Sequence, residues 1–254
     1  MTEIVTIPCL SDNYAYLMYD QPSGRTAVID VPDEEPILQV LAARGWQLTD
    51  ILITHHHNDH IDGVSALRHA TGAAVWGNSA DAARLPKLDN QVAEGDTIEI
   101  GALTGQVIDV SGHTIGHVAF YFPGAKAAFT ADSLMALGCG RLFEGDAATM
   151  WTSLSKLAAL PADTLIYSGH EYAASNARFA LTIEPSNDAL FARAAGIDAA
   201  RSAGRPTVPV RLDEELATNP FLRANLPEVK SAIGMPGATD VDVFAEIRGR
   251  KDRF

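Results

Sequence analysis

Several features that define particular classes of protein are scarce in this sequence. Its 254 residues include only two cysteines, Cys9 and Cys139, which are too few for a disulfide framework and typical of a reducing compartment. No segment approaches the roughly 18 consecutive apolar residues of a membrane span. The N-terminus lacks the basic stretch and apolar core of a secretory signal. We therefore expect a soluble protein of the cytoplasm that does not act in a membrane.

Positive charge is also scarce, because 19 Lys and Arg residues face 32 Asp and Glu residues and give a net charge of −13. Nucleic acids and anionic membranes both attract basic surfaces, so neither is expected as a partner. The last eleven residues, Phe244 to Phe254, are an exception with four basic and two acidic side chains. An anionic substrate would have to be met by such a local patch.

The hydrophobic pattern predicts an α/β (α+β) domain followed by helices. Strands are expected at Ile4–Ile7, Tyr14–Tyr19, Ala27–Ile29, Ile51–Ile53, Ala74–Trp76, Thr97–Ile100, Gln106–Val110, Val118–Phe122, Ala127–Phe129 and Leu165–Tyr167. Helices are expected at Pro36–Arg44, Val64–Ala70 with Asp62 as its N-cap, Thr149–Leu160, Ala174–Thr182 and Asp188–Ala203. Strand signals stop after Tyr172, which predicts one domain over residues 1–172 and a helical one over 173–254.

Four of the eight histidines fall in the heptapeptide Thr54-His55-His56-His57-Asn58-Asp59-His60. An expression tag would be terminal and uninterrupted, which excludes that origin. A solvated polar loop is the other interpretation, but His and Asp are the ligands that zinc and similar metals take. The cluster therefore indicates a metal site.

Spacing within the cluster suggests how two ions could be served. In extended chain His55 and His57 point to one side and His56 to the other. Asp59 and His60 are adjacent, so they could serve a second ion if the chain turns there, as Asn58 permits.

Further ligands are needed to complete two sites. His113, Asp132 and His170 each follow a predicted strand, where functional residues commonly lie. Each alone could be an ordinary turn or buried residue, but together with the cluster they favour a metal centre. His117 is expected to have a supporting role, and His69 to be a polar helix residue.

These residues resemble the metallo-β-lactamase superfamily, and within it the type II glyoxalases, or hydroxyacylglutathione hydrolases. The heptapeptide identifies only the superfamily. Three further motifs belong to the same resemblance: Gly112-His113-Thr114, Thr130-Ala131-Asp132-Ser133 and Gly169-His170-Glu171-Tyr172. The narrower resemblance comes from the remaining motifs: Ser11-Asp12-Asn13-Tyr14, Gly138 to Gly145, Asn219-Pro220-Phe221-Leu222-Arg223 and Arg248 to Phe254. The resemblance implies an αββα sandwich of two mixed sheets flanked by helices, with a C-terminal helical domain that binds glutathione.

The resemblance also implies the site residues. One metal would take His55, His57 and His113, the other would take Asp59, His60 and His170, and Asp132 would bridge them. Zinc is expected, although iron and manganese accept the same ligands. Glutathione would lie near Arg141, Phe143, Tyr172, Arg248 and Lys251. Relatives often have Lys in place of Arg141 and Tyr in place of Phe143, and the second change removes a hydroxyl.

The expected reaction is hydrolysis of S-D-lactoylglutathione to glutathione and D-lactate by a hydroxide held between the metals, as the second step of methylglyoxal detoxification. Asp59 is expected as a ligand that could also accept a proton, and Cys139 as a structural residue. A thiolate leaves without prior protonation because its conjugate acid has a pKa of about 8.5. The alternatives are a one-iron dioxygenase for glutathione persulfide and a metal-binding protein without turnover. We expect a monomer.

Overall fold

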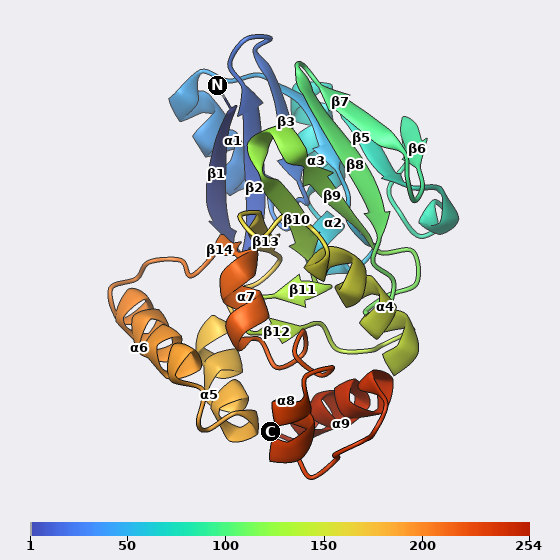
Figure 1. The fold of residues 1–254 in the computed structure, drawn as a ribbon. Coiled ribbons are helices and arrows are strands. Elements are labelled where there is room, and N and C mark those ends of the chain that lie inside the picture. Colours follow the sequence, from blue (N-terminus) through green and yellow to red (C-terminus); the bar gives the residue numbers. More distant parts are fainter. Residues whose placement is uncertain (1) are drawn as a thin grey trace. The chain divides into compact units, whose positions relative to one another are not determined.

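The computed structural model describes residues 2–254 of the chain (Figure 1). Contacts within the chain define two compact units. One comprises the chain up to Asp109 together with Thr114–Ala131, and the other comprises Val110–His113 and Asp132–Phe254. The predicted division into 1–172 and 173–254 stays a prediction.

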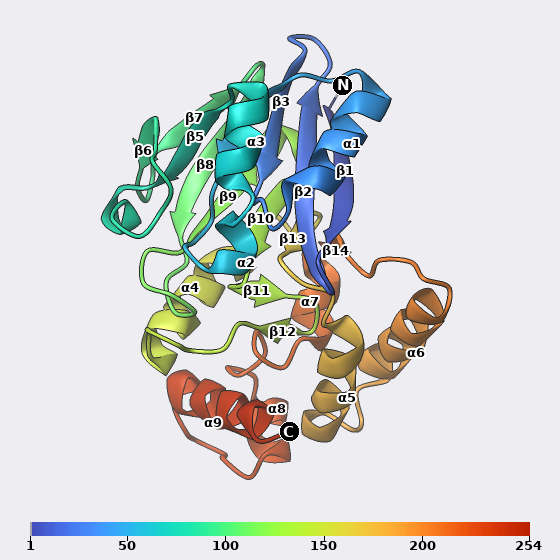
Figure 2. The same ribbon diagram turned by 180° about the vertical axis from the view of Figure 1, so that it is seen from behind.

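The first unit contains a mixed six-stranded sheet in the order β1-β2-β3-β4-β5-β6. Its strands are β1 (Thr2–Cys9), β2 (Asn13–Asp20), β3 (Arg25–Ile29), β4 (Leu48–Leu52), β5 (Ala74–Asn78) and β6 (Asn90–Val92). Strands β1, β2 and β3 are antiparallel, whereas β3 to β6 are parallel. Parallel neighbours need crossover connections, and helices α1 (Glu34–Arg44) and α3 (Val64–Thr71) lie in them, against one face of the sheet (Figure 2).

Apolar residues of these helices and strands form one buried cluster. Ile37 and Leu41 of α1 and Leu67 of α3 pack with Val28 and Ile51 of the sheet. Full burial of each such side chain contributes about 1.5–3 kcal/mol. This packing fixes the C-terminal end of β4, where the histidine cluster begins.

The same unit holds four antiparallel strands in the order β10-β9-β8-β7. They are β7 (Thr97–Ile100), β8 (Leu103–Asp109), β9 (Val118–Phe122) and β10 (Ala127–Ala131). Every residue of β9 and β10 is buried, as expected for strands covered on both faces. The rings of Tyr16 on β2 and Phe129 on β10 are 5.7 Å apart, so this sheet packs against the first.

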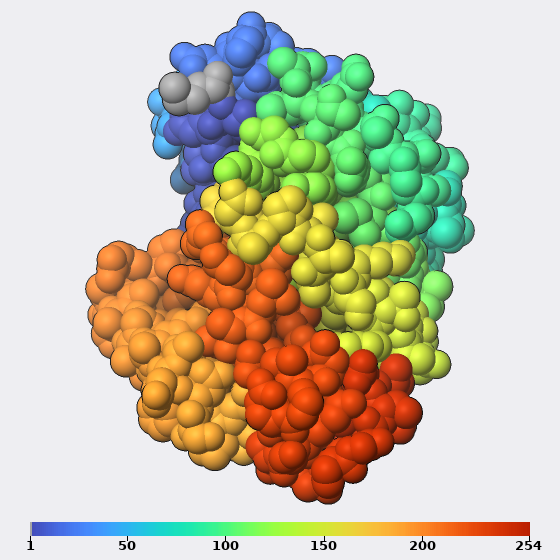
Figure 3. Space-filling view, in the orientation of Figure 1, coloured from blue at the N-terminus to red at the C-terminus, as the bar shows by residue number. Residues whose placement is uncertain are grey.

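The second unit is mainly helical. Its elements are the helices α4 (Ala147–Ala158), α5 (Ala173–Ile183), α6 (Asp188–Ser202), α7 (Leu212–Thr218), α8 (Pro227–Ala232) and α9 (Asp240–Asp252), with the strand pairs β11 (Leu134–Met135) and β12 (Gly138–Cys139), and β13 (Leu165–Ser168) and β14 (Val210–Arg211). Helices α8 and α9 form one block at the C-terminus (Figure 3), where Lys230 and Asp240 pair at 2.7 Å. Nowhere in Thr2–Phe254 is a helix long and apolar enough to cross a bilayer.

The predicted α/β class is confirmed, and each predicted strand and helix overlaps an observed one. Two details were wrong. Asp62 does not cap α3, because it ends the short helix α2 (Asn58–Ile61) by donating its N–H to Asn58 O at 2.8 Å, and Gly63 precedes α3 instead. Strands also do not stop at Tyr172, since the two-residue strand β14 pairs with β13.

Candidate metal centre

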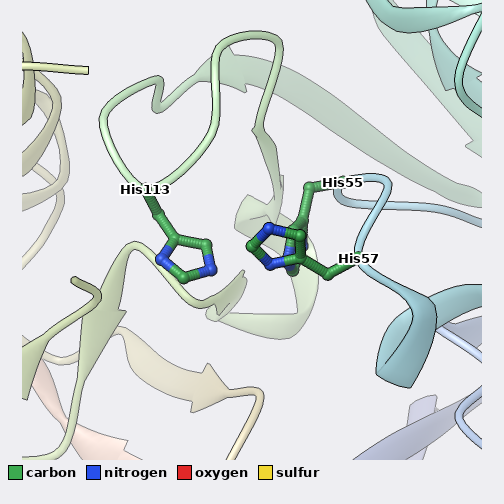
Figure 4. A group of neighbouring side chains, drawn as sticks. All are labelled: His55, His57 and His113. Carbon is green, nitrogen blue, oxygen red and sulfur yellow. The ribbon is translucent and has the colours of Figure 1, made fainter. Parts of the chain in front are cut away.

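The loop between β4 and α2 carries the first group of candidate ligands. His55 Nε2 lies 3.2 Å from His57 Nδ1, and both rings come from this loop (Figure 4). His56 points elsewhere, with its Nδ1 3.0 Å from Asp81 Oδ2. The alternation predicted for extended chain is therefore observed.

Helix α2 then turns the chain, as predicted, and presents Asp59 and His60. His60 Nε2 lies 3.8 Å from Asp59 Oδ2. Asn13 donates through Nδ2 to Asp59 Oδ2 at 2.9 Å and to Asp59 O at 3.0 Å. Asn13 therefore orients this carboxylate.

Asp30, for which the sequence carries no local signal, orients His60. Its Oδ2 accepts a hydrogen bond from His60 Nδ1 at 2.8 Å. Its carboxylate also accepts from Thr54 N at 2.8 Å and from Thr54 Oγ1 at 2.7 Å. Because a carboxylate accepts, Nδ1 of His60 carries the proton and Nε2 keeps the lone pair that a metal needs. One nitrogen each of His55 and His60 and one carboxylate oxygen of Asp30 lie within 4.8 Å of one another.

In the second unit, His113, Asp132 and His170 come together around one oxygen. Asp132 Oδ2 lies 3.4 Å from His113 Nε2 and 3.2 Å from His170 Nε2. His113 Nδ1 donates to Arg141 O at 2.7 Å, which leaves Nε2 as the acceptor nitrogen. His113 follows β8, Asp132 follows β10 and His170 follows β13, as the sequence predicted.

Backbone geometry allows this close approach. Ala131 has a left-handed φ of 41° immediately before Asp132, a conformation that costs about 1–3 kcal/mol for a non-glycine residue. A Cβ on Gly140 would lie 1.9 Å from Asp132 O. Only glycine fits at position 140, which keeps the Arg141 carbonyl within reach of His113.

A buried polar network supports the β11–β12 hairpin between Asp132 and Arg141. Glu215 of α7 is fully buried and accepts from Leu137 N at 3.0 Å and from Asn219 Nδ2 at 2.8 Å. Asn219 Nδ2 also donates to Gly138 O at 3.0 Å. Arg193 pairs with Glu215 and offsets its charge. Losing one partner of such a buried pair typically costs about 3–5 kcal/mol, so this segment is firmly held.

The observed distances fit metal binding. Two ligands of one tetrahedral zinc ion, each about 2.0–2.1 Å from it, lie roughly 3.3 Å apart. The separations of 3.2 Å between His55 and His57, and of 3.4 Å and 3.2 Å from Asp132 to its two histidines, match this value. Imidazole and carboxylate groups are also the chemical types that zinc, iron and manganese accept. The clusters therefore fit divalent metal ions.

The five residues expected near glutathione all lie in the second unit. The ring of Tyr172 stacks on His170 at 4.7 Å, and the ring of Phe143 meets His113 edge to face at 5.3 Å. Both aromatic side chains are exposed. Arg141 Nε lies 3.4 Å from Asp252 Oδ1.

The basic terminus is the ordered helix α9. Arg248 is buried, donates through Nη1 to Cys139 O at 2.9 Å and through Nη2 to Asp252 Oδ1 at 2.9 Å. Lys251 lies between the rings of Phe179 and Phe254, with Nζ 5.3 Å from each centroid. Burial, with the nearby Arg248 and Arg178, lowers the pKa of Lys251 to about 8.

The thiol of Cys139 is buried, and burial raises its pKa to about 11. A thiol with this pKa stays protonated near neutral pH and is a poor nucleophile. The expected structural role of Cys139 is consistent with this environment.

Comparisons with known proteins identify the family. Residues 12–170 match the metallo-beta-lactamase superfamily, and residues 171–254 match the hydroxyacylglutathione hydrolase C-terminus. A hydroxyacylglutathione hydrolase from Jannaschia sp. is 67% identical over 99% of this chain and 98% of its own. Another, from Cereibacter sphaeroides, is 61% identical over 99% of both. The chain belongs to the hydroxyacylglutathione hydrolase family.

Solved structures show the same fold. ETHE1 from Myxococcus xanthus is 26% identical with a TM-score of 0.68, and the match covers 98% of this chain and 90% of that one. The B3 metallo-beta-lactamase BLEG-1 has the same fold, with 21% identity, a TM-score of 0.68 and coverage of 87% and 99%. The predicted αββα metallo-β-lactamase fold is thereby confirmed. Membership of this superfamily, with the His and Asp clusters, indicates a site for two metal ions.

We predict that Asp132→Asn lowers the metal content from two ions per chain to one or fewer, because a carboxylate that both ions shared would offset the repulsion between them. Elemental analysis of the purified variant measures this. Asp198→Asn, at an exposed position on α6, is the matched control and should keep both ions. Two ions bound to Asp132→Asn with undiminished affinity would exclude Asp132 from the centre.

Proposed function

We propose that the protein hydrolyses S-(2-hydroxyacyl)glutathione thioesters, S-D-lactoylglutathione above all, to glutathione and a 2-hydroxy acid such as D-lactate. This is the second step of methylglyoxal detoxification. The observation that carries the proposal is the convergence of His113 and His170 on one oxygen of Asp132 in a chain that is 67% identical to a hydroxyacylglutathione hydrolase over nearly its full length.

For the metals we propose two zinc ions; the same ligand types also accept iron and manganese. One ion would be held by His55, His57 and His113, the other by Asp59, His60 and His170, and Asp132 would be shared. The position of Asp132 Oδ2 between two imidazoles supports the shared role. The hydrogen bonds at Nδ1 of His60 and His113 support Nε2 as the ligand atom of both residues.

Bound together, such ions lower the pKa of a water molecule and polarise the thioester carbonyl. The residues of the chain keep the donor atoms in place for this chemistry. Asn13 orients Asp59, whose carboxylate can also accept a proton from the attacking water. The glutathione thiolate, with a conjugate-acid pKa of about 8.5, leaves without a general acid.

Glutathione recognition is assigned to Arg141, Phe143, Tyr172, Arg248 and Lys251. Arg141 supplies a positive charge for a substrate carboxylate, whereas Phe143 offers only its ring. Arg248 already donates to Cys139 O, so its contribution to binding is shared with support of the hairpin. Lys251 supplies an ammonium group for a substrate carboxylate.

We further propose that the enzyme works as a monomer in the cytoplasm, on a small-molecule substrate rather than on nucleic acid or a membrane. The net charge of −13 supports the choice of a small molecule over nucleic acid or an anionic membrane, because an acidic protein repels both. A one-iron persulfide dioxygenase and a metal-binding protein without turnover are the alternatives. The relatives with 54% to 67% identity bear the hydrolase name, which favours hydrolysis.

The zinc-loaded protein should release free thiol from S-D-lactoylglutathione under strictly anaerobic conditions, because hydrolysis consumes water and not oxygen. A thiol reagent monitors the reaction, with chelator-treated protein as the control. If the protein instead consumed glutathione persulfide in an oxygen-dependent reaction and did not cleave the thioester, it would be a dioxygenase and not a hydrolase. Absence of both activities in the loaded protein would leave only metal binding.

The pKa of Lys251 predicts a pH dependence of substrate affinity. At pH values below its pKa of about 8 the Lys251 amine is protonated and attracts a carboxylate. At pH values above this pKa the positive charge is lost. We expect KM to rise roughly tenfold between pH 7 and pH 9.5, because the substrate loses one charge-assisted hydrogen bond over this range. The kcat value should change less because the contact is remote from the carbonyl.

Lys251→Arg is the control for this titration. Its guanidinium stays charged throughout the range, so its KM should stay nearly flat. Steady-state kinetics at several pH values measures both proteins. The same rise of KM in Lys251→Arg would mean that Lys251 does not cause it.

A further inference from the structure

His56 is the histidine of the heptapeptide that the proposed metal set leaves out. We propose that His56, Asp81 and Arg84 form a brace that positions the ligand loop Thr54–His60 against the turn Thr114–His117. These three residues are positioning residues, since none of them is assigned to metal or substrate. The inference rests on the proposed function only in that the loop binds metal.

The first arm of the brace holds the ligand loop. His56 Nδ1 donates to Asp81 Oδ2 at 3.0 Å, and the Asp81 side chain is 2% exposed. His56 stands between two candidate ligands in extended chain, where neighbouring side chains point in opposite directions. Anchoring His56 on one side therefore sets the direction of His55 and His57 on the other.

The second arm holds the turn. Asp81 ends the short 3-10 helix η1 (Ser79–Asp81) and accepts from Arg84 Nε. Arg84 then donates through Nη2 to Ile115 O at 2.7 Å. Asn78, at the start of η1, donates to Gly116 O at 2.8 Å. The segment 78–84 therefore makes hydrogen bonds to both the ligand loop and the turn that follows His113.

Close packing limits how the turn can shift. Gly116 has a φ of 92°, and a Cβ there would lie 3.0 Å from Asp81 Cβ. On the other flank of the loop, Val118 N donates to Thr54 O at 2.9 Å and the rings of His55 and His117 stack at 4.5 Å. The ligand loop is therefore held on one flank by this backbone hydrogen bond and on the other by the brace.

The energetic role of the brace is preorganisation. A metal site keeps its affinity only if the supporting residues hold the ligands in the binding geometry. Loss of a group that is hydrogen-bonded directly to a metal ligand typically weakens metal binding about 10–100-fold. The brace acts one residue further from the ligands, so we expect an effect at the lower end of this range. A purely structural cluster would instead lower the melting temperature and leave the zinc affinity of the folded protein unchanged.

The test is the zinc dissociation constant of the full-length protein, measured by competition with a chromophoric chelator, alongside Tm. We expect His56→Leu and Asp81→Asn to weaken zinc binding by roughly tenfold. His56→Asn should restore it, because its Nδ2 stands where the histidine Nδ1 stood and can donate to Asp81. His69→Leu, an exposed position on α3, is the control and should match wild type.

Unchanged zinc affinity in folded His56→Leu and Asp81→Asn would overturn the brace, as would His56→Asn binding zinc as weakly as His56→Leu. If both of the first two variants fail to fold, Arg84→Met decides. Its side chain is 41% exposed, and wild-type zinc affinity there would also overturn the proposal. Because zinc affinity is read without substrate, failure of thioester hydrolysis in wild type would be seen separately.

Discussion

A histidine or a carboxylate can serve a metal only if one particular atom faces it, and the hydrogen bond at its other atom decides which atom that is. This constraint is seen at three of the candidate ligands, His60, His113 and Asp59. Asp30 takes the Nδ1 proton of His60, the carbonyl of Arg141 takes that of His113, and Asn13 fixes the carboxylate of Asp59. The fold supplies these partners from strands and loops far apart in the sequence.

Positioning the partners has a conformational cost. Asp30, Ala131 and Leu137 have φ values of 56°, 41° and 55°, which L-residues rarely adopt. Each such conformation costs about 1–3 kcal/mol. Buried contacts offset these costs, among them the hydrogen bond from Leu137 N to Glu215. Strain and support therefore lie together around the ligands.

The predictable part of the site is local in sequence. The alternation of His55, His56 and His57 follows from extended chain, and the turn at Asn58 follows from its residue type. Asp30, Asp81 and Glu215 were missed because their partners His60, His56 and Leu137 are 30, 25 and 78 residues away. The prediction that Asp62 caps α3 was wrong because Asp62 ends the one-turn helix α2. That helix is too short to leave a periodic pattern in the sequence.

Family resemblance predicts what spacing leaves open, namely which distant residues are expected to complete the ligand set. The structure adds which residues orient the candidate ligands within each unit. Asp30 and Asn13 do so in the first unit, and Arg141 and the β11–β12 hairpin do so in the second. The fold class followed from alternating strands and helices, whereas the strands of two or three residues carried no usable signal.

X-ray absorption spectroscopy of the zinc-loaded protein tests the proposed centre of two ions and seven His and Asp ligands, because it reports the atoms around the metal without substrate. Seven His and Asp ligands predict a first shell of nitrogen and oxygen only, imidazole scattering beyond it, and a metal-to-metal contribution when two ions are bound. Sulfur in the first shell, or a fully loaded protein without metal-to-metal scattering, would contradict the account.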